Sequence, residues 1–198
     1  MNISIIGEPK NTMENISAMI RLWHEEIPKN QIEVDAKRLS KKLIRDRSVL
    51  LKIPTITMEI DMPIFLLYDC KNILSIDINK EPYKFNIDDL GFESNSKFTT
   101  KEELHITSIF KKVKSNLKEE GITDWNKIKY FLPLSTIIKN RVVLTYQQIF
   151  CFFAWAEKNT NAKIQVLKTD LLDKLFEVDP IFFNKQNVDI YIANEESA

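Results

Sequence analysis

Histidine, the side chain that most often serves in acid–base catalysis, is scarce in this chain. Its 198 residues include only two histidines, His24 and His105. A serine or cysteine nucleophile needs a base beside it, commonly a histidine that a third group orients. Each histidine lies on a predicted helix, with no candidate nucleophile placed beside it by the sequence. We interpret both as structural and expect no Ser/His/Asp or Cys/His arrangement.

Acidic residues gather in one polar stretch, where carboxylates could bind a divalent cation. They are Asp77, Glu81, Asp88, Asp89 and Glu93. Their spacing does not match an EF-hand loop. The cysteines, Cys70 and Cys151, also lack Cys-x-x-Cys or Cys/His ligand spacing. We therefore predict no metal site and interpret the acidic stretch as a solvated loop.

Basic residues cluster on two predicted helices, a pattern that could follow a nucleic-acid backbone. The two sets are Lys37, Arg38, Lys41, Lys42, Arg45 and Arg47, and then Lys111, Lys112, Lys114 and Lys118. Acidic residues lie close to the first set in sequence, and the 28 basic and 28 acidic residues give zero formal net charge. No nucleic-acid recognition motif is present. Solvated helical faces are the favoured interpretation, with nucleic-acid binding as an alternative.

The overall composition is that of a soluble globular domain, with 44% hydrophobic and 28% charged residues. The length allows one domain with a hydrophobic core. No apolar segment is long enough to span a bilayer and no signal-peptide pattern occurs, so we expect a cytoplasmic protein of a bacterial or virus-infected cell. With only three glycines, a glycine-rich phosphate-binding loop is excluded.

Apolar periodicity predicts the elements that must position these residues. Alternation predicts a strand at residues 55–62 and a closing strand from Val188, Ile190 and Ile192. Richness in β-branched residues predicts a strand at 136–144, and a short first strand is predicted at 2–6, ended by Gly7. Helical spacing predicts helices at residues 13–26, 35–46, 64–71, 124–131 and 146–157, with a last helix around residues 164–175. Residues 75–97 are predicted to form a long loop, with room for a short strand.

Two sequences of the capping-box type predict where helices begin. Thr100-Lys-Glu-Glu103 opens a long helix that Gly121 ends, and Thr145-Tyr-Gln-Gln148 opens the helix at residues 146–157. The second helix is apolar on nearly all sides, so it must be buried in the core or between subunits. We favour the subunit interface for it.

Several short motifs then resemble one enzyme family. They are Met62-Pro63-Ile64-Phe65, Asn79, Lys84-Phe85, Glu119-Glu120-Gly121-Ile122, Phe131-Leu132-Pro133-Leu134 and Asn161-Ala162. Their order and spacing resemble the flavin-dependent thymidylate synthases (ThyX). The resemblance implies an α/β fold of the α+β type, a central sheet with packed helices. It also implies a single domain over residues 1–198, with a variable loop at 75–99. Members of the family join a flavin and deoxyuridine monophosphate at the subunit interfaces of a homotetramer.

The resemblance fails at the residues that carry the family's chemistry. The signature is Arg-His-Arg, then serine, then Arg-Tyr; here the first three positions hold Asn72, Ile73 and Leu74. Pro82 takes the place of the serine, and Lys84-Phe85 that of Arg-Tyr. Arginine supplies a bidentate fork for phosphate, which a single lysine charge does not replace.

Other positions of the family's site have also changed. An upstream arginine is replaced by Tyr68, one at the start of the buried helix by Gln147, and a later one aligns near Ala156. A His-Glu-Thr stretch that contacts flavin aligns with Arg47-Ser48-Val49. Asn79 is the polar position that is kept. The family-equivalent positions are Tyr68, Asn72, Asn79, Lys84 and Gln147, but we carry over no catalytic residue and predict no cofactor.

Three functions remain open at this point. The favoured one is a catalytically silent relative that acts as an oligomeric structural or regulatory protein, assembling with itself or with an active nucleotide enzyme. The first alternative is an enzyme that binds or modifies a pyrimidine deoxynucleotide, a methyl or hydroxymethyl transferase with FAD and dUMP. The second alternative is a nucleic-acid-binding module.

Overall fold

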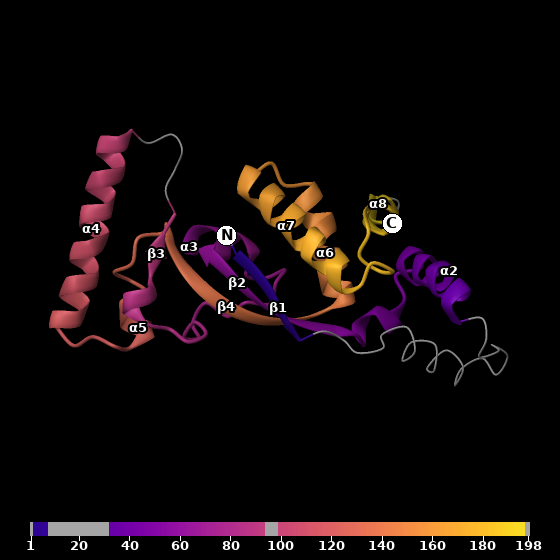
Figure 1. The fold of residues 1–198 in the computed structure, drawn as a ribbon, viewed down its shortest axis with the longest axis horizontal. Coiled ribbons are helices and arrows are strands. Elements are labelled where there is room, and N and C mark those ends of the chain that lie inside the picture. The colour runs from indigo at the N-terminus through magenta and orange to yellow at the C-terminus, as the bar shows by residue number, and fades with distance from the viewer. Residues whose placement is uncertain (1, 8–31, 94–98, 197–198) are drawn as a thin grey trace. The chain divides into compact units, whose positions relative to one another are not determined.

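The computed structural model describes residues 2–7, 32–93 and 99–196. The predicted helix at residues 13–26 lies outside these ranges. The described strands are β1 (Asn2–Gly7), β2 (Thr55–Pro63), β3 (Gly91–Phe92) and β4 (Thr136–Thr145). They form one sheet in the order β1-β2-β4-β3 (Figure 1). The predicted strands at residues 2–6, 55–62 and 136–144 are therefore confirmed, and the predicted α+β fold is also confirmed.

Alternation determines which faces of the two long strands are buried. On β2, the side chains of Ile56, Met58, Ile60 and Met62 are fully buried, whereas the three residues between them are half-buried. On β4, Ile138, Val142 and Leu144 are buried, while Lys139 and Arg141 are exposed. Each long strand thus presents a charged row on the face opposite its apolar row.

Seven α-helices lie within the described ranges. They are α2 (Ile32–Arg45), α3 (Ile64–Cys70), α4 (Thr100–Glu119), α5 (Trp125–Ile128), α6 (Tyr146–Glu157), α7 (Ala162–Val178) and α8 (Lys185–Glu196). Two 3-10 helices, η2 (Val49–Lys52) and η3 (Ile87–Asp89), add single turns. The first six α-helices confirm helices that the sequence predicts. No helix in the described part of the chain is long and apolar enough to cross a membrane.

The chain divides into two compact units, and β2 and β4 run through both. The first unit is Met1–Asn2 with Glu59–Arg141, and carries α3, α4 and α5. The second is Ile3–Met58 with Val142–Ala198, and carries α2, α6, α7 and α8. Below they are the α3–α5 unit and the α6–α8 unit. The expectation of a single domain over residues 1–198 stays a prediction.

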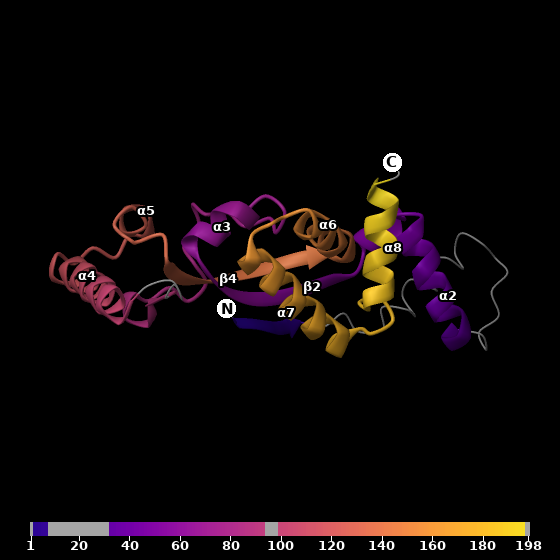
Figure 2. The ribbon, with the colours of Figure 1, turned by 90° about the horizontal axis from the view of Figure 1, so that it is seen from above.

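Helix α6 forms the core of the α6–α8 unit, where it contacts both α7 and α8 (Figure 2). Phe150 stacks on Phe183 and on Tyr191, with ring centroids 5.5 and 5.2 Å apart. Phe152 and Phe153 are also fully buried. The assignment of α6 to a subunit interface is therefore wrong for its three phenylalanines, which are buried within the same chain, whereas Trp155 is half-buried.

The closing strand predicted from Val188, Ile190 and Ile192 is also wrong. These residues lie in α8, whose first turn is capped by Asn184: its Oδ1 accepts from the backbone N–H of Asn187 at 3.0 Å. Burial follows helical spacing instead, since Asn187, Val188 and Tyr191 are the buried residues. Because Asn187 and Tyr191 lie on the buried face, the apolar residues alone do not show helical spacing here.

Both predicted capping boxes exist, one of them displaced by a residue. Thr145 and Gln148 cap α6 reciprocally, as predicted. Helix α4 is capped by Thr99 and Glu102 rather than by Thr100 and Glu103. Consecutive Thr-Thr and Glu-Glu pairs offer two equivalent registers, which the local sequence does not separate.

Candidate functional site

The stretch after α3 is held against β4 and α5 in the α3–α5 unit. The backbone N–H of Tyr83 donates to the Lys139 carbonyl at 3.0 Å, and that of Glu93 donates to the Ser135 carbonyl at 2.8 Å. The Phe85 ring meets the Trp125 ring edge-on at 5.1 Å. The predicted loop at residues 75–97 is therefore fixed at several described points, and it contains the short β3.

An arginine that the sequence analysis did not single out completes this arrangement. The guanidinium carbon of Arg141 lies 3.5 Å from the centroid of the Tyr83 ring. Its Nη2 donates to Oε1 of Glu59 at 2.7 Å, and Lys139 Nζ lies 3.8 Å from the other oxygen of Glu59. A planar guanidinium both stacks on an aromatic ring and pairs with a carboxylate, which an ammonium does less well. Arg141 thereby joins β2, β4 and the Tyr83 loop.

A cavity of about 420 Å³ opens beside Tyr83. Its charged lining residues are Asp61, Lys84, Asp89 and Lys139, and Leu90 and Ile137 are among the apolar ones. Lys84 has a backbone φ of 51°, in the left-handed region that non-glycine residues adopt infrequently. A concave site of this size, with both signs of charge at an apolar wall, has the form of a small-molecule site.

The family-equivalent positions are only partly gathered at this cavity. Lys84 lines it. Tyr68 is 48% exposed on α3, with Lys71 Nζ 5.5 Å from its ring centroid. Asn72 is exposed just after α3. The Oδ1 of Asn79 accepts a hydrogen bond from Nζ of Lys129 at 2.9 Å, so the Asn79 side chain is held at the C-terminal end of α5.

Gln147 belongs to the α6–α8 unit, where it is half-buried in the first turn of α6. In the same unit, the Arg47 guanidinium carbon lies 5.0 Å from the Tyr191 ring centroid. The Tyr191 hydroxyl and Cys151 Sγ are 3.2 Å apart, and burial with this contact raises the pKa of Tyr191. Arg47, which aligns with the family's flavin-contacting stretch, is thus packed against α8.

Two of the residues that the resemblance aligns with the family's signature are closed to solvent. Leu74 is fully buried and Pro82 is also buried. Ile73 is half-buried. Leu74 and Pro82 therefore contribute apolar contacts to the α3–α5 unit and present no hydrogen-bond donor to a phosphate.

The sequence held a signal for Arg141 and Lys139 that the analysis missed. Both alternate with buried residues on β4, as Glu59 and Asp61 alternate with buried residues on β2. Two amphipathic strands with opposite charges on their polar rows favour pairing side by side. The sequence analysis did not use this complementarity.

The second basic set predicted from sequence is partly used within the chain. Lys114 Nζ donates to the carbonyl oxygens of Asp88 and Leu90 at 2.7 and 3.1 Å, and Lys118 forms an ion pair with Asp88. Two of its four lysines are therefore engaged by residues 88–90. The interpretation of the basic sets as solvated faces stays a prediction, with nucleic-acid binding as its alternative. Among the described residues, no group of three His, Cys, Asp or Glu side chains could hold a metal ion.

No protein-family model matches the chain, and no curated protein matches its sequence. Solved structures do match. The first is thymidylate synthase X from Helicobacter pylori with FAD and dUMP, with a TM-score of 0.68 and 16% identity over 95% of this chain and 99% of the other. The fold resembles that of a ThyX subunit.

Two further solved structures agree with this likeness. A second Helicobacter pylori structure, flavin-dependent thymidylate synthase ThyX complexed with FAD and dUMP, has a TM-score of 0.64 and 16% identity, covering 93% of this chain and 98% of the other. The UMP/dUMP methylase PolB from Streptomyces cacaoi, bound with 5-Br dUMP, has a TM-score of 0.58 and 11% identity, covering 97% and 94%. At such identities the likeness concerns the ThyX fold alone.

Proposed function

We propose that this protein keeps the ThyX fold but not the flavin-dependent methyl transfer, and acts as an oligomeric structural or regulatory protein. The observation that carries the proposal is the residue set at the Arg-His-Arg positions. Asn72 is exposed, Ile73 half-buried and Leu74 fully buried, and none of them is a cation. Binding the phosphates of FAD and dUMP needs cationic or backbone donors, and Lys84 alone supplies one point charge.

Exposed apolar side chains support the assembly part of the proposal. On the segment after α5, Tyr130, Phe131 and Leu134 are 80, 57 and 61% exposed. Large apolar side chains so close together on a surface are typical of a contact with another protein. We expect copies of this chain, or a nucleotide enzyme of the same fold, to cover them.

Three measurements on the purified protein test the proposal together. We expect a colourless protein without flavin absorption bands, no conversion of dUMP to dTMP, and a mass by light scattering above the 23.2 kDa of one chain. The double variant Phe131→Glu, Leu134→Glu should lower this mass, whereas Val166→Glu, at an exposed residue of α7, should not. A yellow protein that methylates dUMP would overturn the loss of chemistry. A monomer would overturn the assembly.

A second candidate function is the binding of a pyrimidine deoxynucleotide, and the cavity beside Tyr83 favours it. Lys84 and Lys139 line this cavity, and Tyr83 lies at its wall with Arg141 behind the ring. A nucleotide would place its phosphate at the lysines and its base against apolar wall residues. The expected affinity for the phosphate is modest, because Asp61 and Asp89 compete with it for the ammonium groups of the two lysines.

Ligand-induced stabilisation tests this second candidate. A ligand present at 100 times its dissociation constant stabilises the native state by about 2.7 kcal/mol. For a chain of this size that raises the melting temperature by roughly 5–11 °C. We expect dUMP, but not deoxyuridine, to raise it, and Lys84→Met to reduce the shift while Lys80→Met preserves it. Equal melting temperatures with and without 10 mM dUMP, about 100 times a 0.1 mM dissociation constant, would dispose of the candidate.

A further inference from the structure

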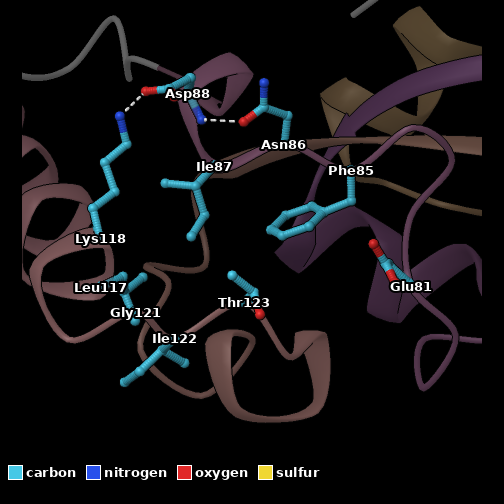
Figure 3. A pocket seen from close by; sticks show the side chains of 10 residues that line it. All are labelled: Glu81, Phe85, Asn86, Ile87, Asp88, Leu117, Lys118, Gly121, Ile122 and Thr123. Carbon is cyan, nitrogen blue, oxygen red and sulfur yellow. Dashed lines mark hydrogen bonds and ion pairs between the residues drawn. The ribbon is translucent and has the colours of Figure 1, made fainter.

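A second cavity, of about 380 Å³, lies in the α3–α5 unit between the 81–88 loop and the end of α4. Its apolar walls are Phe85, Ile87, Leu117 and Ile122 (Figure 3). Phe85 is fixed from behind by the Trp125 ring, and Trp125 is itself only 5% exposed. One wall of the cavity is therefore a positioned aromatic ring rather than a mobile side chain.

The charges that line this cavity are not equivalent. Lys118 and Asp88 form an ion pair, and the hydrogen bond from Lys118 lowers the pKa of the Asp88 carboxyl. Glu81 lines the cavity on the side away from this pair in Figure 3. Within the described residues, Glu81 has no hydrogen bond or ion pair. The unpaired charge among the lining residues is therefore negative.

We propose that this cavity binds a small organic cation, an alkyl or arylalkyl amine that is protonated at neutral pH. Its ammonium group pairs with Glu81, and its apolar body lies against Phe85 and Ile122. An ammonium beside an aromatic ring also gains from the ring's negative face. Divalent metal ions are poor ligands for this cavity, since they need several oxygen ligands and the apolar walls offer one unpaired carboxylate.

An amine bound in this cavity would affect the cavity beside Tyr83, because the two cavities share lining residues. Phe85 and Asn86 line both cavities. Lys84, the residue before Phe85, has the left-handed backbone conformation noted above. An amine seated against Phe85 would bias the position of Lys84. Binding of the amine itself does not depend on whether the Tyr83 cavity binds a nucleotide.

The experiment uses phenethylamine as the probe, with 2-phenylethanol and phenylacetate as neutral and anionic probes of similar size. Isothermal titration of the full chain should give a dissociation constant on the order of 1 mM for the amine, as expected for so small a ligand. Glu81→Gln should weaken it about fivefold, the upper range for an exposed ion pair. Glu120→Gln, which removes an exposed carboxylate outside the cavity, should leave it unchanged.

Thr123→Lys gives an independent variant, because Thr123 is exposed and lines the same cavity. The added ammonium should repel the probe and abolish measurable binding while the melting temperature stays close to that of the parent. The proposal is overturned if phenethylamine does not bind saturably, if phenylacetate binds equally well, or if Glu81→Gln and Thr123→Lys bind like the parent. Weaker binding in both variants, with no change in Glu120→Gln, supports it.

Discussion

The guanidinium of Arg141 lies against the ring of Tyr83, with 3.5 Å between the guanidinium carbon and the ring centroid. The same guanidinium donates to Glu59, and the backbone of Tyr83 donates to the Lys139 carbonyl. The loop that carries Lys84 is thus attached to β4 by a main-chain hydrogen bond and by a side-chain stack. The geometry of the Tyr83 cavity depends on both.

A double-mutant cycle measures the side-chain part of this attachment. Arg141→Met and Tyr83→Leu should each lower the free energy of unfolding by about 1 kcal/mol, because each removes the stack and the arginine also loses an ion pair. The coupling energy should be about 0.5–1 kcal/mol in urea titrations. Lys139→Met serves as the control, since its 3.8 Å ion pair with a shared carboxylate should contribute little. Strict additivity of the two changes would contradict the stack.

The difference between what the sequence predicts and what it misses follows from sequence distance. Alternation and capping act over a few residues, so β2, β4 and the start of α6 are predicted almost to the residue. Arg141 meets Glu59 across 82 positions. Alternation places each residue on the charged row of its own strand, but only the pairing of β2 with β4 decides which residue lies opposite which.

Two failures have a different physical cause. Helix α8 buries Asn187 and Tyr191 along with Val188, so its inward face does not read as apolar. The side-chain amide of Asn187 is satisfied in part by the carbonyls of Ile181 and Phe182. Helix α6 was assigned to a subunit interface because it is apolar all round, yet α7 and α8 cover it. The sequence shows how much apolar surface a helix must bury, but not whether the same chain or another subunit covers that surface.

The two capping boxes should differ in their contribution to stability. Thr145→Ala should cost about 1–2 kcal/mol, because Thr145 Oγ1 accepts from the N–H of Gln148 at the start of a buried helix. Thr99→Ala should cost about 0.5–1 kcal/mol at the exposed start of α4. Thr100→Ala, one residue further, is the matched control and should cost less than Thr99→Ala. If Thr100→Ala were the more damaging change, the register of the α4 cap would be wrong.

Stability should depend on pH through Asp179. Burial raises the pKa of this carboxyl above its usual value, although Tyr146 Oη and the N–H of Phe182 donate to it at 2.7 and 3.3 Å. The native state therefore holds this proton to a higher pH than the unfolded chain does. The free energy of unfolding should fall as pH rises from about 4 through the raised pKa.

Asp179→Asn removes this titration. Its stability relative to the parent should therefore improve between pH 4 and pH 7, on top of a constant offset for the hydrogen bond that the amide does not replace. Asp173→Asn, which removes an exposed carboxylate of α7, is the matched control and should run parallel to the parent. Urea titrations at four pH values in this range give the comparison. A difference between parent and Asp179→Asn that stays constant with pH would show that folding does not raise the pKa of Asp179.

The two cysteines should react at very different rates in the native protein. Burial, with a smaller effect from the neighbouring Asp69, raises the pKa of the Cys70 thiol to about 12. The thiolate is the nucleophile, and at pH 8 a thiol with that pKa is ionised in about one molecule in ten thousand. Cys70 is also fully buried, whereas Cys151 is half-buried. Iodoacetamide at pH 8 should therefore modify Cys151 first.

Mass spectrometry of a Cys151→Ser variant isolates the behaviour of Cys70. With one thiol left, labelling should be negligible over hours in buffer and complete within minutes in a urea concentration that unfolds the chain. The ratio of these rates reports how often α3 opens, because Cys70 lies at the last turn of that helix. Rapid labelling in buffer would mean that α3 separates easily from the sheet, and that the Pro82–Phe85 loop following it in sequence lacks a stable support.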